Sequence, residues 1–268
     1  MINRHDLKRI IGTLRLLIHE NGVGGAFLAI RDRIQLERKL FPYRNMESVN
    51  LNGSIFDVTG LPHVSLKLAL LTKTYEDFER RAVLQYLRPD LPVIELGGCI
   101  GVVACITNKL LRDSSAHVVV EANPNVLSHL NDNRARNACE FEVLNAAIAY
   151  DKEFVTFVPS MDFWGSSLEQ KNGGEPVTVK TVRLKDIVSQ RNFKSFNLIC
   201  DIEGYEYDLV RHEVEILENA DTIIIETHAR MIGERKTAEL LDSLQRMGFK
   251  TVLQDSFVYV LRRSADAN

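Results

Sequence analysis

The sequence lacks the features that mark membrane, secreted and nucleic-acid-binding proteins. Its apolar runs all fall well short of the roughly 20 residues that a membrane-spanning helix needs. The net charge is only −3, so no strong basic field argues for a nucleic-acid partner. The four cysteines show no metal-like pairing and are expected to be reduced thiols. With no evident signal peptide, these absences predict a cytoplasmic protein.

The remaining composition is that of a globular α/β protein with an accessory segment. The chain has 268 residues, of which 45% are hydrophobic and 26% charged. Apolar residues recur at helical spacing through residues 1 to about 45, and a glycine-rich break at 21–25 divides them into two helices. We therefore expect an N-terminal helical cap or dimer arm over 1–50 and a main domain over 51–268. A peripheral membrane helix is the alternative, which the interspersed acids weaken.

Patterning predicts a doubly wound sheet in the main domain. Ser54–Lys67 is expected to be a hairpin across Gly60-Leu61-Pro62, and Thr74 is expected to cap a helix that runs to Leu87. After that, strands are expected over 92–96, 117–121, 141–148, 153–158, 177–183, 196–201, 221–227, 249–254 and 256–262, with helices over 100–112, 124–137, 205–217 and 234–247. Alternation of this kind favours a mostly parallel sheet with helices on both faces. The last two strands are close enough to form an antiparallel hairpin.

A glycine-rich turn joins the first of these core strands to its helix. The dinucleotide-binding fingerprint requires glycine at the first, third and sixth positions of this turn, but Cys99 and Val102 occupy the last two. An acid followed by glycine two and six positions later is typical of methyltransferases, and Glu95, Gly97 and Gly101 fit that pattern. The antiparallel ending favours the same class. We therefore predict S-adenosylmethionine as cofactor, with Glu95 either facing its amino-acid or sulfonium end or capping the turn amides.

Two later strand ends and Asp201, which follows a further strand, complete the predicted cofactor site. Glu121 follows the turn by roughly 20–25 residues, where an acid binds a ribose diol. Ala146 ends the third strand, where a small residue lets an adenine ring lie against the backbone, although ordinary packing is an equal alternative.

Acidic residues and one histidine end the next two strands. Asp201 and Glu203 follow one strand, and Glu226 and His228 end its neighbour, so all four are expected at the same sheet edge. His228, Glu203 and Asp201 are the candidates for a general base. The cluster can also hold Mg²⁺ or Mn²⁺ through Asp201, Glu203 and Glu226, but the spacing is not diagnostic and a metal-free site is preferred.

Four segments together resemble the FkbM family of S-adenosylmethionine-dependent methyltransferases, over about residues 74–262. They are Glu95-Leu96-Gly97-Gly98-Cys99-Ile100-Gly101, Glu121-Ala122-Asn123-Pro124, Asp201-Ile202-Glu203-Gly204-Tyr205-Glu206 and Ile225-Glu226-Thr227-His228. The resemblance implies a Rossmann-like class I methyltransferase fold with a seven-stranded sheet, and methylation of hydroxyl oxygens on sugars or other natural-product scaffolds. Cys99 departs from the family, which commonly has asparagine there.

The resemblance also suggests what the acceptor contacts. Trp164 and Ser166 belong to a segment similar to the family's serine-containing loop, and an aromatic ring there suits stacking on a sugar. With Glu226 they are the predicted substrate-binding residues. We expect an O-methyltransferase for a sugar in a glycan or glycosylated metabolite, acting without a nucleic-acid partner and able to form a homodimer through its N-terminal helices. A non-sugar hydroxyl acceptor and a non-catalytic nucleotide-binding scaffold are the alternatives.

Overall fold

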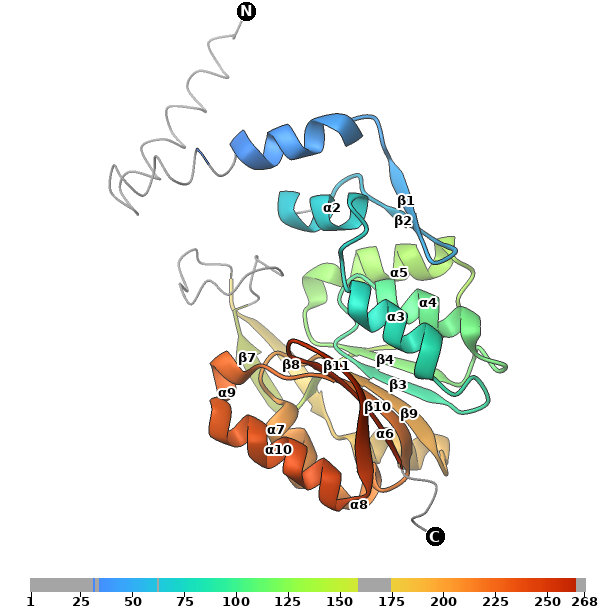
Figure 1. Ribbon diagram of the computed structural model, residues 1–268, viewed down its shortest axis with the longest axis vertical. Helices are drawn as coiled ribbons and strands as arrows, with labels where there is room; N and C mark the ends of the chain where they lie inside the picture. The colour runs from blue at the N-terminus through green and yellow to red at the C-terminus, as the bar shows by residue number, and fades with distance from the viewer. Residues whose placement is uncertain (1–30, 32–33, 62, 159–174, 264–268) are drawn as a thin grey trace, which may run out of the picture. The chain divides into compact units, whose positions relative to one another are not determined.

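The computed structural model describes residue 31 and residues 34–61, 63–158 and 175–263 (Figure 1). Trp164, Ser166 and most of the predicted N-terminal helices lie outside these residues, so their predicted roles stay predictions. The chain divides into two compact units. Among the described residues, the smaller unit holds 31, 34–47, 58–61 and 63–75, and the larger unit holds the rest. Within the described part, no helix has the length and apolar character that a bilayer crossing requires.

The smaller unit consists of helices and connecting segments where it is described. Residues 34–40 are helical, the 3-10 helix η1 follows at Phe41–Tyr43, and α2 spans Val64–Leu71. The hairpin predicted over Ser54–Lys67 is therefore wrong, since its second half is α2. The actual hairpin joins β1 (Ser48–Leu51) to β2 (Ser54–Asp57) in the larger unit. It turns at Asn52 and Gly53, which both have positive φ, as two-residue hairpin loops require.

A seven-stranded sheet forms the centre of the larger unit. Its order is β11-β12-β10-β9-β3-β4-β5, and all pairs are parallel except those made by β12. These strands are β3 (Val93–Leu96), β4 (His117–Glu121), β5 (Glu142–Asn145), β9 (Phe196–Cys200), β10 (Ala220–Glu226), β11 (Phe249–Asp255) and β12 (Val258–Arg263). The mostly parallel sheet and its antiparallel C-terminal hairpin are confirmed. β3 and β9 are neighbours although about a hundred residues separate them, which brings the glycine turn beside the acidic segment after β9.

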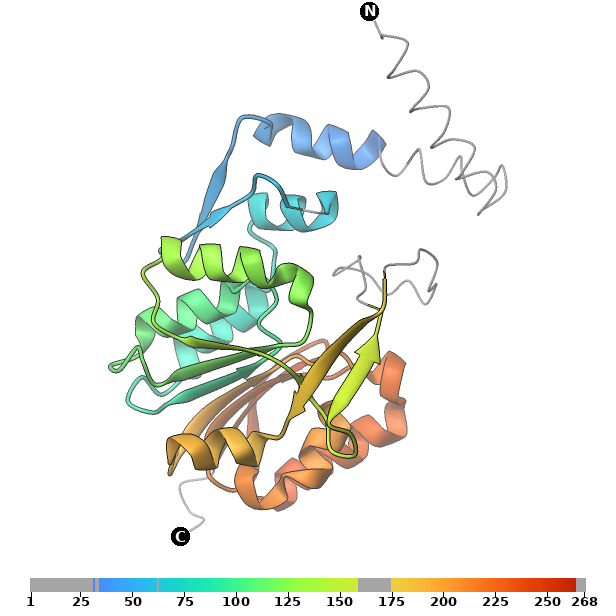
Figure 2. The ribbon, with the colours of Figure 1, turned by 180° about the vertical axis from the view of Figure 1, so that it is seen from behind.

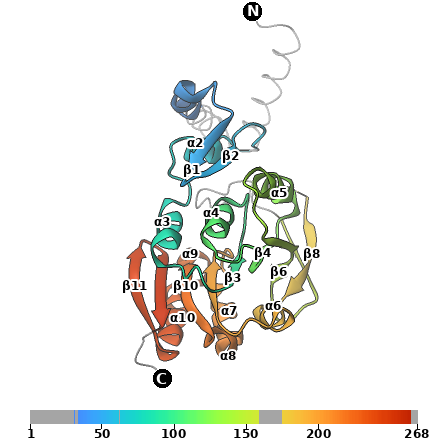
Figure 3. The ribbon, with the colours of Figure 1, turned by 90° about the vertical axis from the view of Figure 1, so that its right-hand side faces the viewer.

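Helices cover both faces of this sheet, as Figure 3 shows. On one face lie α3 (Asp77–Tyr86), α4 (Val102–Leu110) and α5 (Leu127–Arg136), which follows the 3-10 helix η2 (Pro124–Val126). On the other lie α6 (Leu184–Arg191), α7 (Glu206–His212), α8 (Val214–Leu217) and α10 (Glu234–Arg246). Alternate residues of the central strands pack on opposite helical layers, so most residues of these strands are apolar.

Smaller elements differ from the sequence-based expectations. The strand expected over 141–148 is broken at Ala146 into β5 and β6 (Ala147–Ile148). The strand β6 belongs to a separate sheet in the order β6-β8-β7, with β7 (Phe154–Phe157) and β8 (Val177–Val182). Figure 2 shows β7 and β8 side by side. The helix α6 was not predicted. Thr74 does not cap α3, because its hydroxyl donates to the Ala69 carbonyl and α3 begins at Asp77 after Glu76.

Candidate functional site

The turn between β3 and α4 can be made only with glycine at its first position. Gly97 has φ +91°, and a Cβ atom there would lie 1.7 Å from the carbonyl oxygen of Asp201. The amides of Gly97 and Gly98 both donate to the Val120 carbonyl at the end of β4. Gly101, at φ +81°, is the N-cap of α4. The turn therefore brings the ends of β3, β4 and β9 into close contact.

Glu121 accepts two backbone hydrogen bonds at the end of β4. One of its oxygens accepts from the Cys99 amide at 2.7 Å and the other from the Asn123 amide at 2.6 Å. Its burial raises its pKa, and these amide donors oppose that shift. The carboxylate is thus fixed beside the glycine turn, and each oxygen keeps a lone pair for a further donor.

Glu95 is buried beneath α4. It is 2% exposed, and one of its carboxylate oxygens lies 3.5 Å from Nε2 of His117. Burial raises its pKa, whereas the contact with His117 and a hydrogen bond from the Ala104 amide oppose the rise. Ala104 lies in the first turn of α4, so Glu95 supports the helix N-terminus. This geometry favours the capping alternative over a direct cofactor contact.

Ala146 directly follows β5, at the sheet edge predicted to bind the cofactor. It is 8% exposed, and its amide donates to the Glu121 carbonyl at 3.2 Å. Its methyl group belongs to the core cluster between the sheet and α6. Its contact with an adenine ring stays a prediction.

His228 lies at the centre of a group of four carboxylates. Its Nε2 atom is 3.6 Å from an Asp201 oxygen, 3.4 Å from a Glu203 oxygen and 4.0 Å from a Glu226 oxygen. Asp201 and Glu203 follow β9, and Glu226 ends β10, so the structure does bring the predicted residues together. Glu203 has φ +51° and a side chain 68% exposed, which places it on the open side of the cluster.

Glu206 also belongs to this cluster, although sequence analysis assigned it no role. It is fully buried in the first turn of α7, and it accepts from Nδ1 of His228 at 2.8 Å. The same oxygen accepts from the Gly204 amide at 3.0 Å. Glu206 ends the acidic segment after β9, and that position at a helix start is the only signal that could have found it.

The charges of this cluster act mainly on His228. Burial tends to lower its pKa, but the hydrogen bond to Glu206 and the negative charges of Asp201 and Glu203 outweigh that and raise its pKa to about 9. With these neighbours alone His228 is an imidazolium near neutral pH, which differs from the neutral base expected from the sequence. Burial, and next the charge of Glu226, raise the pKa of Asp201.

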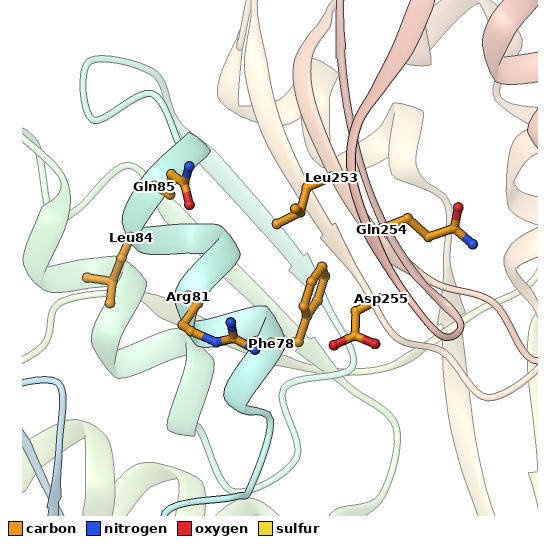
Figure 4. Close-up of a pocket in the computed structure, with 7 residues that line it drawn as sticks. All are labelled: Phe78, Arg81, Leu84, Gln85, Leu253, Gln254 and Asp255. Atoms are coloured by element: carbon orange, nitrogen blue, oxygen red, sulfur yellow. The ribbon is translucent and has the colours of Figure 1, made fainter.

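Glu79 extends the acidic region from α3. Burial raises its pKa to about 7, and the charges of Glu226 and Asp255 add to the rise. Asp255 lines a groove between α3 and β11 (Figure 4). The groove is formed by Phe78, Arg81, Leu84, Gln85, Leu253, Gln254 and Asp255.

The donor set fits a cofactor that carries hydroxyl and ammonium groups. Glu121 offers carboxylate oxygens beside the turn. A buried oxygen of Asp201 has no hydrogen-bond partner among the described residues. Both acids face the edge where parallel sheets bind their ligands. Asp201, Glu203 and His228 could also hold a metal ion, because one ligand atom from each lies within 4.8 Å of the others.

Known proteins resemble this chain at low identity. A hexuronic acid methyltransferase, AglP, from Haloferax volcanii is 23% identical over 176 residues, which cover 62% of this chain and 71% of AglP. An rRNA methylase from Streptococcus thermophilus has a TM-score of 0.45 at 9% identity, over 69% of this chain and 94% of that chain. A putative O-methyltransferase from Klebsiella pneumoniae has a TM-score of 0.44 at 12% identity, over 70% and 80%.

A family model gives the decisive match. Residues 95–251, more than half of the chain, match the methyltransferase FkbM domain. The matched segment contains the glycine turn, Glu121 and the whole acidic cluster around His228. S-adenosylmethionine is the usual cofactor of this family and fold. The chain therefore belongs to the FkbM family and is an S-adenosylmethionine-dependent methyltransferase.

Proposed function

We propose that this protein methylates a hydroxyl oxygen of a sugar in a glycan or glycosylated metabolite. The observation that carries the proposal is the meeting of two groups at one sheet edge. Gly97, in the cofactor turn, packs directly on the backbone of Asp201, the first residue of the acidic cluster. A cofactor held by the turn and Glu121 would thus have its reactive end beside the groups that can receive a proton.

The chemistry required of the chain is mainly positioning. S-adenosylmethionine supplies an electrophilic methyl group on a sulfonium. An acceptor oxygen forms the new O–C bond, the C–S bond breaks with its electron pair left on sulfur, and the hydroxyl proton passes to a base. Alignment of the reacting atoms lowers the barrier by several kcal/mol, at most about 7–11. Asp201 and Glu203 remain the proposed proton acceptors because they lie beside His228 at the edge of the sheet, and His228 itself can accept a proton only in its neutral form.

A sugar acceptor is supported by the similarity to AglP and by the polarity of the site. AglP is named for methylation of a hexuronic acid, and it matches this chain across most of its own length. The acceptor side presents carboxylates from β9 and β10, which can accept hydrogen bonds from sugar hydroxyls. A glycan with several free hydroxyls suits such a surface better than an apolar scaffold does.

Two measurements test this function. Calorimetry with S-adenosylhomocysteine should give saturable binding, NAD should give none, and Glu121→Gln should weaken the former. Transfer of a labelled methyl group should then be compared between hexose or hexuronic acid glycosides and phenolic or polyketide hydroxyls. Binding of S-adenosylhomocysteine with transfer only to the non-sugar acceptors would refute the sugar assignment. Absence of that binding would refute the cofactor site.

A further inference from the structure

We propose that Asp201, Glu203 and His228 bind a divalent transition-metal cation, and that Glu206 orients His228 for that binding. Cation binding itself is independent of the acceptor, whereas its use beside an acceptor hydroxyl rests on the proposed function.

The distances from Nε2 of His228 to the two carboxylates are close to those around one cation, and all three ligand atoms lie within 4.8 Å of one another. Metal–nitrogen and metal–oxygen bonds of about 2.1 Å place neighbouring ligand atoms about 3.0–3.4 Å apart in octahedral or tetrahedral sites. Nε2 of His228 lies 3.4 Å from Glu203 and 3.6 Å from Asp201. These distances are long for hydrogen bonds, so Nε2 faces oxygen atoms that it does not bind well. A cation between them would satisfy all three atoms with small adjustments.

Glu206 provides a second observation that points to a cation. Its side chain is 0% exposed and its Oε2 atom has no hydrogen-bond partner among the described residues, while Oε1 accepts from Nδ1 of His228 at 2.8 Å. A carboxylate that holds the far nitrogen of an imidazole fixes the tautomer whose other nitrogen is free to ligate. The amide of Gly204 and, more weakly, that of Ile202 hold Glu206 in place. This carboxylate–histidine arrangement is the usual support of metal-bound histidine.

The charges and donor types narrow the kind of cation. Two carboxylates and a neutral imidazole balance a divalent charge, and Glu226, 4.0 Å from Nε2, adds negative field. The imidazole ligand favours Fe²⁺ or Zn²⁺ over Mg²⁺ and Ca²⁺, and the two carboxylate ligands also suit Mn²⁺. With three protein ligands, positions remain open for water or an acceptor hydroxyl.

The cation would also resolve a charge conflict in the acceptor site. A hexuronic acid carries a carboxylate, and four protein carboxylates would repel it. A bound divalent cation would reduce that repulsion and polarise the acceptor hydroxyl so that it loses its proton more easily.

Mn²⁺ is the probe for the test, added to the full-length chain after metal removal with a chelator. We expect the electron paramagnetic resonance signal of free Mn²⁺ to report one saturable site per chain. Electron spin echo modulation should show an imidazole ¹⁴N coupling, which needs no variant. Asp201→Asn and His228→Gln should lower Mn²⁺ affinity at least tenfold, and Glu206→Gln about 10–100-fold. Glu215→Gln, an exposed acid on α8, is the matched control and should bind as the unaltered chain does.

Three results would overturn the proposal. They are no saturable Mn²⁺ binding, bound Mn²⁺ without a nitrogen coupling, and unaltered affinity in folded Asp201→Asn and His228→Gln proteins. None of these depends on methyl transfer. If S-adenosylhomocysteine still binds in the chelator-treated protein, the proposed function survives the loss of the metal site. If Mn²⁺ binds with a nitrogen coupling and S-adenosylhomocysteine does not bind, the metal site survives the loss of the proposed function.

Discussion

Replacement of Gly97 by alanine should destabilise this fold more than replacement of a comparable glycine elsewhere. The new Cβ atom would lie 1.7 Å from the Asp201 carbonyl oxygen and 2.8 Å from its carbonyl carbon. Both are backbone atoms of the residue that follows β9, so no side-chain rotation relieves the overlap. The ends of β3 and β9 must separate, although the Asp201 amide donates to the Leu96 carbonyl at 2.8 Å.

Two contributions add in the expected loss of stability. The positive φ of Gly97 costs an L-residue about 1–3 kcal/mol. Displacement of well-packed backbone costs about 1–3 kcal/mol more. The sum, about 2–6 kcal/mol, is a large fraction of the 5–15 kcal/mol typical of folded domains. Gly233→Ala is the matched control, because Gly233 has φ +89° but nothing within 4 Å of its added Cβ.

Urea unfolding of the two variants isolates the packing contribution. Gly97→Ala should lower the free energy of unfolding by about 1–3 kcal/mol more than Gly233→Ala does. It should also weaken binding of S-adenosylhomocysteine, because the turn and Asp201 move together. Equal losses of stability in the two variants, with unchanged binding, would refute the claim that this contact fixes the site. Failure of Gly97→Ala alone to fold would agree with it.

Three further predictions follow from single side chains. Glu121→Gln should lower the affinity for S-adenosylhomocysteine about 10–100-fold by calorimetry, through loss of a charge-assisted contact of about 1–3 kcal/mol; unchanged affinity would remove Glu121 from the cofactor site. Asn197→Ala should destabilise the fold by about 1–3 kcal/mol in urea, since the Asn197 amide pairs with both the N–H and the carbonyl of Arg88; a loss below about 0.5 kcal/mol would contradict this. Burial raises the pKa of Glu79 to about 7, so ionisation of Glu79 in the folded state lowers the free energy of unfolding as pH rises from 4.5 through 7. Glu79→Gln should therefore have a free energy of unfolding about 1–3 kcal/mol higher than that of the unaltered chain at pH 8, but nearly the same at pH 4. An equal difference at both pH values would contradict the raised pKa.

The central sheet could be predicted because its strands are buried on both faces. Most residues of β3 and the run Ile223–Ile225 of β10 are apolar, and short buried runs of this kind favour parallel strands. The N-terminal hairpin was mispredicted for the opposite reason. Its strands are four residues long and half exposed, so the decisive signal was the Asn52-Gly53 pair and not hydrophobic periodicity. The short helix α6 has only eight residues and likewise carries too little pattern.

The candidate site could likewise be predicted only in part. Strand ends placed Asp201, Glu226 and His228 at one edge, and topology alone guaranteed that they would meet there. The role of Glu206 depends on the direction of one buried side chain at the start of α7, and no residue spacing encodes that direction. Yet this side chain decides which nitrogen of His228 faces the carboxylates, and so whether the cluster is a proton acceptor or a cation site. The chemistry at this edge therefore depends on a second layer of residues, for which the sequence supplies candidates and only the packing supplies the roles.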